Sequence, residues 1–421
     1  MNYHEIDNLK KLFFEYFNKE YGHEILSGAS LAPTEDDSVL FTPAGMHPLI
    51  PYLAGAKKHP LGNKLTSVQG VVRTGQIDKV GEGAFFTFFE SFGVWELNNY
   101  SKSETLKKVW NFFTSNNFLG IPDNKISVTY FAGTNRVAED FETKKLWKKI
   151  GIPDEHIVPS EKNWKGPYSS FKICGPNTRL FYDTGKSKCS QNCSPMCNCG
   201  KYVELWDIVF FDYILDDDEL KLSPNPCVDM GAGVERIAQF IQSADTIYDT
   251  NEFREIATLV KKMQNKNIEQ VSDEILKKIR IIADHIRCAC FIIADETVTL
   301  PSNKGRGYVL RKIIRRIINN CNELNIDFLN SYMLIDKIIE IYEKNYPKLR
   351  EKKEYIYKVL VAEYNIYALT LTKNILKIEK ILKKTNVITT DEIYYLFNTY
   401  GIPVDTIKKE AQKMKVLIKE K

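Results

Sequence analysis

The first 245 residues carry strand-like segments that are not separated by regular helices, and this pattern restricts the fold more than any other feature. Four runs rich in β-branched and aromatic residues are set apart by Gly, Pro and Asn, at residues 38–46, 83–97, 125–133 and 201–214. No G-x-G-x-x-G motif follows a strand-like run, so a doubly wound parallel sheet is disfavoured. We therefore expect an α+β fold for this part of the chain.

From about residue 246 onward the pattern becomes helical. Apolar residues recur at helical spacing in residues 273–295 and 307–321, and the C-terminal part is rich in Lys and Ile. A chain of 421 residues suggests two or three domains at ~150 residues each. We predict an α+β domain over residues 1–245, with a Cys-rich insertion at 186–201, and an all-helical domain over residues 246–421.

The composition indicates a globular protein of a reducing compartment. Apolar residues make up 43% and charged residues 27%, which are ordinary values. No run of ~18 apolar residues is present, and the amphipathic N-terminus lacks the features of a signal peptide. The nine cysteines are unevenly spaced, which disfavours a disulfide framework. We expect a cytoplasmic protein with no membrane partner, and the net charge of +4 does not by itself indicate nucleic acid.

Residues 71–93 read as two strands joined by a Gly-containing loop, a long antiparallel hairpin. Arg73 falls at the end of the first strand, and Phe88, Phe89 and Glu90 fall on the second. A guanidinium beside an exposed aromatic ring can clamp a phosphate and stack a base. The alternative is an ordinary hairpin whose aromatic side chains form core.

Residues 227–241, CVDMGAGVERIAQFI, contain a helix start with an unusual charge. The apolar positions from Val234 to Ile241 have the spacing of a core-facing helix, and Asp229 lies just upstream. Arg236 adds a fixed cation to the positive end of this helix, which suits a polyanion such as a triphosphate. Glu235 would keep the arginine aimed or hold Mg²⁺. The alternative is a salt bridge from Arg236 to a surface acid.

Four thiols fall within eleven residues: Cys189, Cys193, Cys197 and Cys199. Four thiolates suit a tetrahedral Zn²⁺ ion and leave no open coordination position, so we predict structural zinc. The spacing C-x3-C-x3-C-x-C differs from the usual C-x2-C pairs. Free thiols or disulfides, and an iron–sulfur cluster, therefore remain as alternatives.

The segment LPSNKGRGYVLRKIIRR, residues 300–316, concentrates positive charge. It contains six cations and no acid: Lys304, Arg306, Arg311, Lys312, Arg315 and Arg316. A phosphate backbone would be attracted to such a stripe. The alternative is a solvated charged face.

Taken together, these motifs resemble those of the alanyl-tRNA synthetases, a family of class II aminoacyl-tRNA synthetases. The hairpin with Arg73 resembles class II motif 2, and GAGVERIA resembles motif 3. The segments LFTPAGM, TFFESFG, RIIADHIRCACFIIAD and LFNTYGIPVD are similar to family segments, in colinear order from about residue 5 to 410. The resemblance implies a class II antiparallel sheet flanked by helices, followed by a helical tRNA-recognition domain.

The resemblance also implies roles for individual residues. Arg73 would hold the ATP α-phosphate and Arg236 the γ-phosphate, with Glu235 as a further catalytic residue and Mg²⁺ bridging the phosphates. The implied ATP-binding residues are Arg73, Phe88, Phe89, Glu90 and Arg236, with one phenylalanine stacked on adenine. The implied amino-acid-binding residues are Trp164, Asp207, Asp229 and Gly231, with Asp229 receiving the α-amino group. The implied contacts to the tRNA acceptor stem are Asn303, Lys304, Arg306, Arg311, Arg315 and Asn398.

Some positions depart from the family pattern. Asp207 stands where asparagine is usual, Arg179 stands where an acid is usual, and Asn398 replaces an aspartate. We predict a ligase that activates alanine, or another small amino acid, with ATP and transfers it to tRNA. Two alternatives stay open: the same activation with a carrier protein or peptide as acceptor, and a non-catalytic module that binds tRNA or ATP. The predicted ATP site requires that Arg73 and Arg236 face one cavity.

Overall fold

The protein is described from a computed structural model, which places residues 5–33, 39–83, 85–168, 171–197, 199–264, 272–400, 402 and 404–419. The chain forms two compact units, Met1–Arg254 and Glu255–Lys421, called unit 1 and unit 2 below. Each unit is described by itself.

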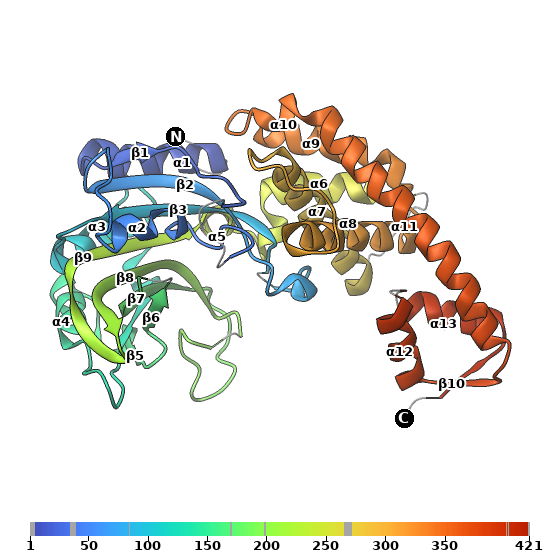
Figure 1. Ribbon diagram of the computed structural model, residues 1–421. Coiled ribbons are helices and arrows are strands. Elements are labelled where there is room, and N and C mark those ends of the chain that lie inside the picture. The colour runs from blue at the N-terminus through green and yellow to red at the C-terminus, as the bar shows by residue number, and fades with distance from the viewer. Residues whose placement is uncertain are drawn as a thin grey trace. The chain divides into compact units, whose positions relative to one another are not determined.

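Unit 1 is built on a nine-stranded sheet in the order β1-β2-β3-β9-β8-β7-β4-β5, with β6 paired to β7 (Figure 1). The pairs β1–β2 and β4–β5 are parallel and the other pairs are antiparallel, so the sheet is mixed. The α+β prediction is confirmed, and the antiparallel arrangement holds for the central strands. The strands are β1 Glu24–Leu26, β2 Lys64–Val72, β3 Phe88–Glu96, β4 Ile126–Phe131, β5 Ile157–Ser160, β6 Trp164–Tyr168, β7 Ile173–Asp183, β8 Tyr202–Asp216 and β9 Glu219–Gly233.

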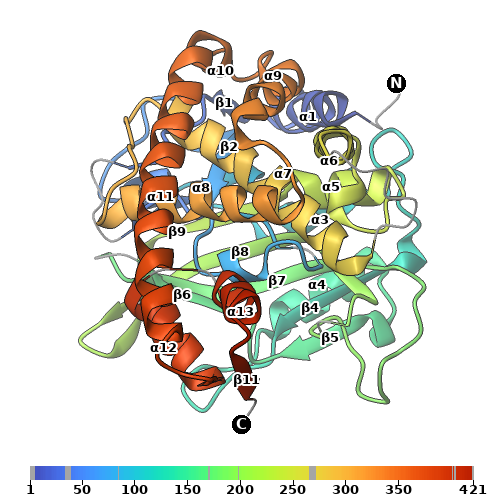
Figure 2. The same ribbon diagram turned by 90° about the vertical axis from the view of Figure 1, so that its right-hand side faces the viewer.

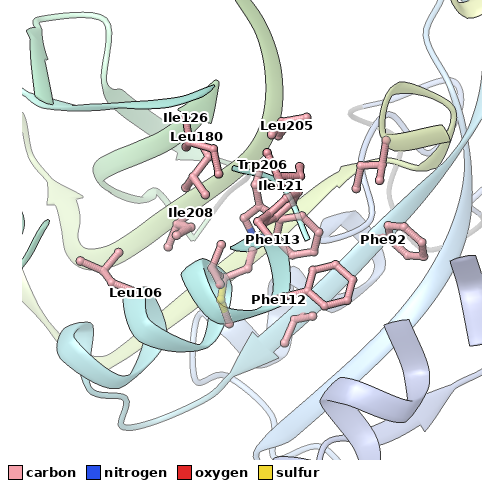
Figure 3. Close-up of a cluster of buried hydrophobic side chains, with 14 of the residues drawn as sticks. Phe92, Leu106, Phe112, Phe113, Ile121, Ile126, Leu180, Leu205, Trp206 and Ile208 are labelled. Atoms are coloured by element: carbon pink, nitrogen blue, oxygen red, sulfur yellow. The ribbon is translucent and has the colours of Figure 1, made fainter. Parts of the chain in front are cut away.

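Helices cover one face of this sheet and enclose the larger core. Figure 3 shows side chains of α3 and of strands β3, β4, β7 and β8 gathered into one cluster. Phe112, Phe113 and Trp206 are fully buried there, and each such side chain contributes about 1.5–3 kcal/mol by leaving water. The helices of this unit are α1 Ile6–Phe14, α2 Ile50–Leu53, α3 Lys102–Thr114, α4 Phe141–Ile150 and α5 Val234–Ile241, and α6 Asn251–Lys262 crosses into unit 2.

The opposite face of the sheet is covered only in part by a smaller cluster. Met46, Leu49 and the short helix α2 pack there against Trp95 and Val209. The predicted strand-like run at 38–46 contributes to this cluster, but its described residues 39–46 form turns rather than a strand. Pro43 has no N–H to donate to a strand partner, which explains the difference.

Unit 2 is mainly helical. Its helices are α7 Asp273–Ala294, α8 Gly305–Glu323, α9 Ser331–Tyr342, α10 Lys348–Glu351, α11 Lys353–Leu382, α12 Thr390–Tyr400 and α13 Val404–Lys413. Figure 2 shows α11 as one long helix with α12 and α13 beside its C-terminal end, where they share a core. Two short parallel strands, β10 Val387–Thr389 and β11 Leu417–Lys419, add a small sheet that the all-helical prediction did not contain.

Candidate active site

A cavity of about 380 Å³ opens over strands β3, β9 and β8 of unit 1, on the face away from the larger core. Residues far apart in the sequence line it, including Arg73 and Arg236. Arg73 and Arg236 therefore face one cavity, as the predicted ATP site requires. Seven of the predicted site residues line this cavity: Arg73, Phe89, Asp207, Asp229, Gly231, Glu235 and Arg236.

Two facing glycines form the floor of the cavity. Gly93 on β3 is the register partner of Gly231 on β9. A Cβ on Gly231 would lie 2.4 Å from the backbone oxygen of Phe92, and a Cβ on Gly93 would lie 2.1 Å from the Trp95 ring. A side chain at either position would force the strands or the indole to move. The glycines therefore keep the sheet surface open to a ligand.

Arg73 directly follows strand β2, at the end of the predicted hairpin. Its backbone N–H donates to the Thr87 carbonyl at 2.8 Å, which continues the pairing of β2 with β3. Its guanidinium donates from Nε to the Pro43 carbonyl at 3.2 Å and lies 4.8 Å from the centre of the Phe89 ring. The cation and the aromatic ring are thus presented together, as a phosphate clamp beside a stacking surface requires.

Arg236 lies in the first turn of α5, which begins directly where strand β9 ends. Val234, Ile237 and Ala238 anchor that helix in the larger core. The Arg236 side chain lines the cavity, where its Nη1 lies 3.3 Å from Oε1 of Glu204. Glu204 also accepts from Nη1 of Arg179 at 3.5 Å. A carboxylate therefore already balances the Arg236 charge.

Glu235 and Glu90 are both buried, but their side chains have different partners. The Glu235 carboxylate lines the cavity and accepts the backbone N–H of Glu90, at 3.3 Å from Oε1 and 3.2 Å from Oε2. The Glu90 side chain forms an ion pair with Lys10 of α1 at 2.6 Å. Glu235 therefore ties the start of α5 to strand β3, while the Glu90 side chain faces the helical layer.

Asp229 on β9 is half-buried in the cavity wall. Its Oδ1 accepts the indole N–H of Trp95 at 2.7 Å. Burial, and next the negative charge of Asp207, raise the pKa of Asp229 to about 7, whereas the Trp95 hydrogen bond and Lys165 act in the opposite direction. A carboxylate with this pKa is poised to gain from a cationic partner.

Asp207 is the centre of a small charged network. Its Oδ2 lies 3.0 Å from Nζ of Lys165, and its Oδ1 accepts from Nδ2 of Asn177 at 2.5 Å and lies 3.8 Å from Nε of Arg179. Arg179 is also the register partner of Asp207 across β7 and β8. Two of the departures noted in the sequence, Arg179 and Asp207, are therefore paired with each other.

Three of the predicted ATP-binding and amino-acid-binding residues do not line the cavity. Phe88 and Glu90 point to the other face of β3, because side chains alternate along a strand and Phe89 occupies the cavity face. Trp164 packs against Phe131 and Tyr213, with ring centres 5.2 and 5.6 Å apart. The structure brings Lys165, its neighbour, into the cavity in its place.

Sequence patterns did not indicate Glu204, Lys165 or Tyr168, which also line the cavity. Register shifts explain two of these omissions. One shift falls between Leu180 and Phe181 of β7, opposite Trp206 and Glu204, and another falls between Lys165 and Tyr168 of β6. A bulge adds one residue and reverses the alternation beyond it, so both ends of the bulge face the cavity. The charge of Glu204, three residues before Asp207, was the available signal.

The four predicted cysteine ligands come together in unit 1, outside the cavity. All four Sγ atoms of Cys189, Cys193, Cys197 and Cys199 lie within 4.8 Å of one another. The closest pairs are Cys189–Cys197 at 3.4 Å and Cys193–Cys199 at 3.6 Å. A tetrahedral zinc site with Zn–S bonds of about 2.3 Å has sulfur atoms about 3.8 Å apart. The spacing and the donor set therefore fit one metal ion.

The predicted basic stripe lies on helix α8 of unit 2 and its preceding turn. Asn303 and Lys304 are exposed, and Arg306 is half-buried. Arg311 and Arg315 are held by Glu363 of α11, with distances from Nε of 3.2 and 2.7 Å to its Oε1. Asn398 lies in α12, but its side chain is outside the described residues.

Comparison with known proteins places this geometry in a family. A family model described as "tRNA synthetases class II (A)" matches residues 8–421. An alanine–tRNA ligase of Borrelia hermsii is 40% identical over 416 residues, which cover 97% of this chain and 69% of that protein. The chain belongs to the alanyl-tRNA synthetase family of class II. It is accordingly a ligase.

Two further relatives agree with this assignment. An alanine–tRNA ligase of Treponema denticola is 39% identical over 424 residues, covering 97% of this chain and 69% of that protein. One of Thermotoga maritima is 35% identical over 422 residues, covering 98% of this chain and 47% of that protein. The solved structure of apo S. aureus histidyl-tRNA synthetase matches with a TM-score of 0.35 and 13% identity, over 62% of this chain and 76% of that chain. This structural likeness is too low to add to the assignment.

Among the described residues, no helix combines the length and the apolar character that crossing a bilayer requires.

Proposed function

We propose that this alanyl-tRNA synthetase family member activates alanine, or another small amino acid, with ATP and transfers it to the acceptor stem of a tRNA. The observation that carries the proposal is the shared cavity of Arg73, Arg236 and Asp229. Two guanidiniums can bind separate phosphates of one ATP molecule, and a half-buried carboxylate can bind an ammonium group. Alanine and tRNA are proposed because the relatives are alanine–tRNA ligases.

In the proposed first step, an oxygen of the substrate carboxylate attacks the ATP α-phosphorus. The new O–P bond gives the aminoacyl-adenylate, and the bond to pyrophosphate breaks. Arg73 stabilises charge at the α-phosphate and Arg236 at the γ-phosphate, while Asp229 orients the amino acid through its ammonium group. Alignment and fixed charge account for the catalysis, and no side chain has to transfer a proton in this step.

ATP chemistry of this kind uses Mg²⁺, and the cavity contains carboxylates that fit it. Glu204 and Glu235 both line the cavity near Arg236. Mg²⁺ commonly binds one or two carboxylates together with substrate phosphates. We propose that Glu204 supplies this oxygen ligand when its partner Arg236 binds phosphate, whereas Glu235 remains engaged with the backbone of β3. Bound Mg²⁺ would neutralise phosphate charge.

The proposal is tested by amino-acid-dependent exchange of pyrophosphate into ATP, run with each proteinogenic amino acid. We expect exchange with L-alanine. Absence of exchange with every amino acid would leave a non-catalytic module and would overturn the proposal. Charging of an alanine tRNA transcript then tests the acceptor, because exchange without charging would favour a carrier protein or a peptide. A cytoplasmic location remains a prediction from the cysteine content.

We also propose that the four-cysteine cluster holds one structural Zn²⁺. The motivation is the compact arrangement of Cys189, Cys193, Cys197 and Cys199 around a point that a single ion can occupy. Elemental analysis of the purified chain should give about one equivalent of zinc, and replacing Cys193 by Ser should release it. Cys321→Ala, at a buried thiol of unit 2, is the control and should leave the metal content unchanged. Iron in place of zinc, or less than half an equivalent of either metal, would contradict this proposal.

A further inference from the structure

Lys165 is a third cation in the cavity, and the phosphate roles proposed for Arg73 and Arg236 do not use it. Among the described residues that line the cavity, these three are the Lys and Arg side chains. Lys165 pairs with Asp207, whereas Arg236 pairs with Glu204. Lys165 therefore belongs to the acidic part of the cavity that contains Asp207 and Asp229.

Asp207 has other polar and cationic partners besides Lys165. Oδ1 of Asp207 already accepts from Asn177 at 2.5 Å, and Arg179 lies 3.8 Å from the same oxygen. Lys165 contacts the other oxygen, and its side chain remains 28% exposed. The Lys165 side chain is thus partly exposed, and it lines the cavity that a ligand would enter.

An α-amino acid carries opposite charges on neighbouring groups, and this part of the cavity offers matching charges side by side. Asp207 and Asp229 are register neighbours of the same segment of the sheet, because Asp207 pairs with Gly231 and Val209 pairs with Asp229. Lys165 lies 3.0 Å from Asp207, and both of these charges influence the pKa of Asp229. A zwitterion can therefore place its ammonium beside the two aspartates and its carboxylate beside the lysine. Each of these partly buried charges keeps a partner in this exchange, which avoids the cost of an unpaired ion.

We propose that Lys165 binds the carboxylate of the amino-acid substrate and so selects a zwitterionic α-amino acid. This inference rests on the proposed function and assigns the position that the sequence analysis gave to Trp164. Lys165 holds one carboxylate oxygen, and the other oxygen is free to attack the α-phosphorus. Strand β6 supplies the geometry, because the register shift after Lys165 brings both this residue and Tyr168 into the cavity.

The test compares two probes that differ only at the group in question, L-alanine and L-alaninamide. Their affinities are measured by calorimetry with the full chain and a non-hydrolysable ATP analogue. A charge-assisted contact is worth about 10- to 100-fold in affinity. Lys165→Met should therefore weaken L-alanine by about that factor and leave L-alaninamide unchanged. Equal weakening of both probes, or no weakening of L-alanine, would overturn the inference.

Two further variants separate substrate binding from simple neutralisation of Asp207. The double variant Lys165→Met/Asp207→Asn removes both charges, and we expect it to stay weak for L-alanine. Recovery of wild-type affinity in the double variant would show that Lys165 only neutralises Asp207. Lys165→Arg keeps the charge and should retain most of the affinity, which covers the case in which the Met variant fails to fold.

Lys162→Met is the matched control, because Lys162 is an exposed lysine three residues away. It should leave both affinities unchanged. Pyrophosphate exchange by the wild type distinguishes the two proposals. No exchange with any amino acid would remove the proposed function, whereas normal exchange combined with unchanged L-alanine affinity in Lys165→Met would remove this inference alone.

Discussion

Arg73, Lys165 and Arg236 line one cavity, yet the protein holds each of them in a different way. Arg73 contacts a backbone carbonyl and the face of Phe89, whereas Lys165 and Arg236 pair with carboxylates. The guanidinium of Arg73 is exposed. It can meet a phosphate without first losing an ionic partner, which makes it the residue on which activation should depend most.

Arg73→Ala should lower pyrophosphate exchange by about 100- to 1,000-fold, because it removes a charged contact made to the transition state. The fold should persist, since the side chain lies at the end of β2 and outside both cores. Steady-state exchange and far-UV circular dichroism measure the two effects. Arg136→Ala, at an exposed arginine away from the cavity, should change neither. Activation that survives Arg73→Ala would refute the assignment of motif 2.

Asp229 should set the acid limb of the pH profile. Its pKa is raised from 3.8 to about 7 by burial and by Asp207, so the carboxyl group is protonated below that pH. Only the ionised form can bind an ammonium group, and kcat/KM for the amino acid should therefore fall about tenfold per pH unit below 7. Exchange measured from pH 5.5 to 8.5 gives the profile.

Trp95→Phe provides a directional check on that assignment. The Trp95 indole N–H stabilises the Asp229 carboxylate at 2.7 Å, so its removal should raise the pKa and move the acid limb to higher pH. Lys165 and Asp207 remain in place and contribute as before. A limb that stays in place, or moves to lower pH, would show that another group controls it.

At the scale of elements, the site depends on how strands β3, β9 and β8 are laid beside one another. Gly93, Gly231 and Asp207 form one row across these strands, and Trp95, Asp229 and Val209 form the next. The first row is open because two of its members have no side chain. The second row supplies the half-buried carboxylate of Asp229 and the Trp95 indole that donates a hydrogen bond to it.

Gly231→Ala should both destabilise unit 1 and block the cavity. The added Cβ would lie 2.4 Å from a backbone oxygen of β3, which cannot rotate away. Such overpacking costs about 1–3 kcal/mol, and the shifted strand would displace Asp229. Urea unfolding and exchange kinetics measure the two consequences. Gly75→Ala is the control, since a Cβ there meets nothing within 4 Å, and its stability should match the wild type. Unchanged unfolding of Gly231→Ala would contradict the close approach.

In unit 2, the carboxylate of Glu363 on α11 connects this helix to α8. This side chain is only 1% exposed, and it holds Arg311 and Arg315 at their Nε atoms. Two of the predicted tRNA contacts are therefore oriented by one buried acid.

Glu363→Gln should lower the free energy of unfolding by about 1–3 kcal/mol, because two guanidiniums lose their charged partner. It should also weaken binding of an alanine tRNA transcript, while pyrophosphate exchange stays normal. Glu354→Gln, at an exposed acid on the same helix, should behave as wild type in unfolding and filter-binding assays. Tighter tRNA binding by Glu363→Gln would indicate that the two arginines act better when released.

At the scale of the whole molecule, the cavity residues all belong to unit 1 and the basic stripe belongs to unit 2. We therefore predict that unit 1 suffices for amino-acid activation and that charging of tRNA also requires unit 2. Residues 1–264, which keep α6 whole, should retain amino-acid-dependent pyrophosphate exchange and lose charging of tRNA. The same assays on the full chain provide the reference. A folded fragment without exchange would show that activation requires unit 2, and a fragment that still charges tRNA would remove the stripe from tRNA recognition.

The sequence alone determined much of this outcome. Periodicity and composition predicted the α+β fold, the hairpin of β2 and β3 and the helix that carries Arg236, because these depend on local repeats of two or about 3.6 residues. The sequence also indicated the four-cysteine cluster, through its spacing, and the resemblance to family motifs. The resemblance named Asp207, Asp229 and Gly231, which line the cavity, but it did not choose between Phe88 and Phe89.

Only the tertiary structure decided which side chains enter the cavity. Simple alternation cannot reveal a bulge, because a bulge depends on how a neighbouring strand pairs. The register shifts place Tyr168 on the same face as Lys165 and Glu204 on the same face as Asp207. Trp164, the neighbour of Lys165, lies outside the cavity by ordinary alternation. The pairing of Arg179 with Asp207 likewise required the register of β7 against β8. Charges distant in sequence become partners only when the sheet fixes their distance.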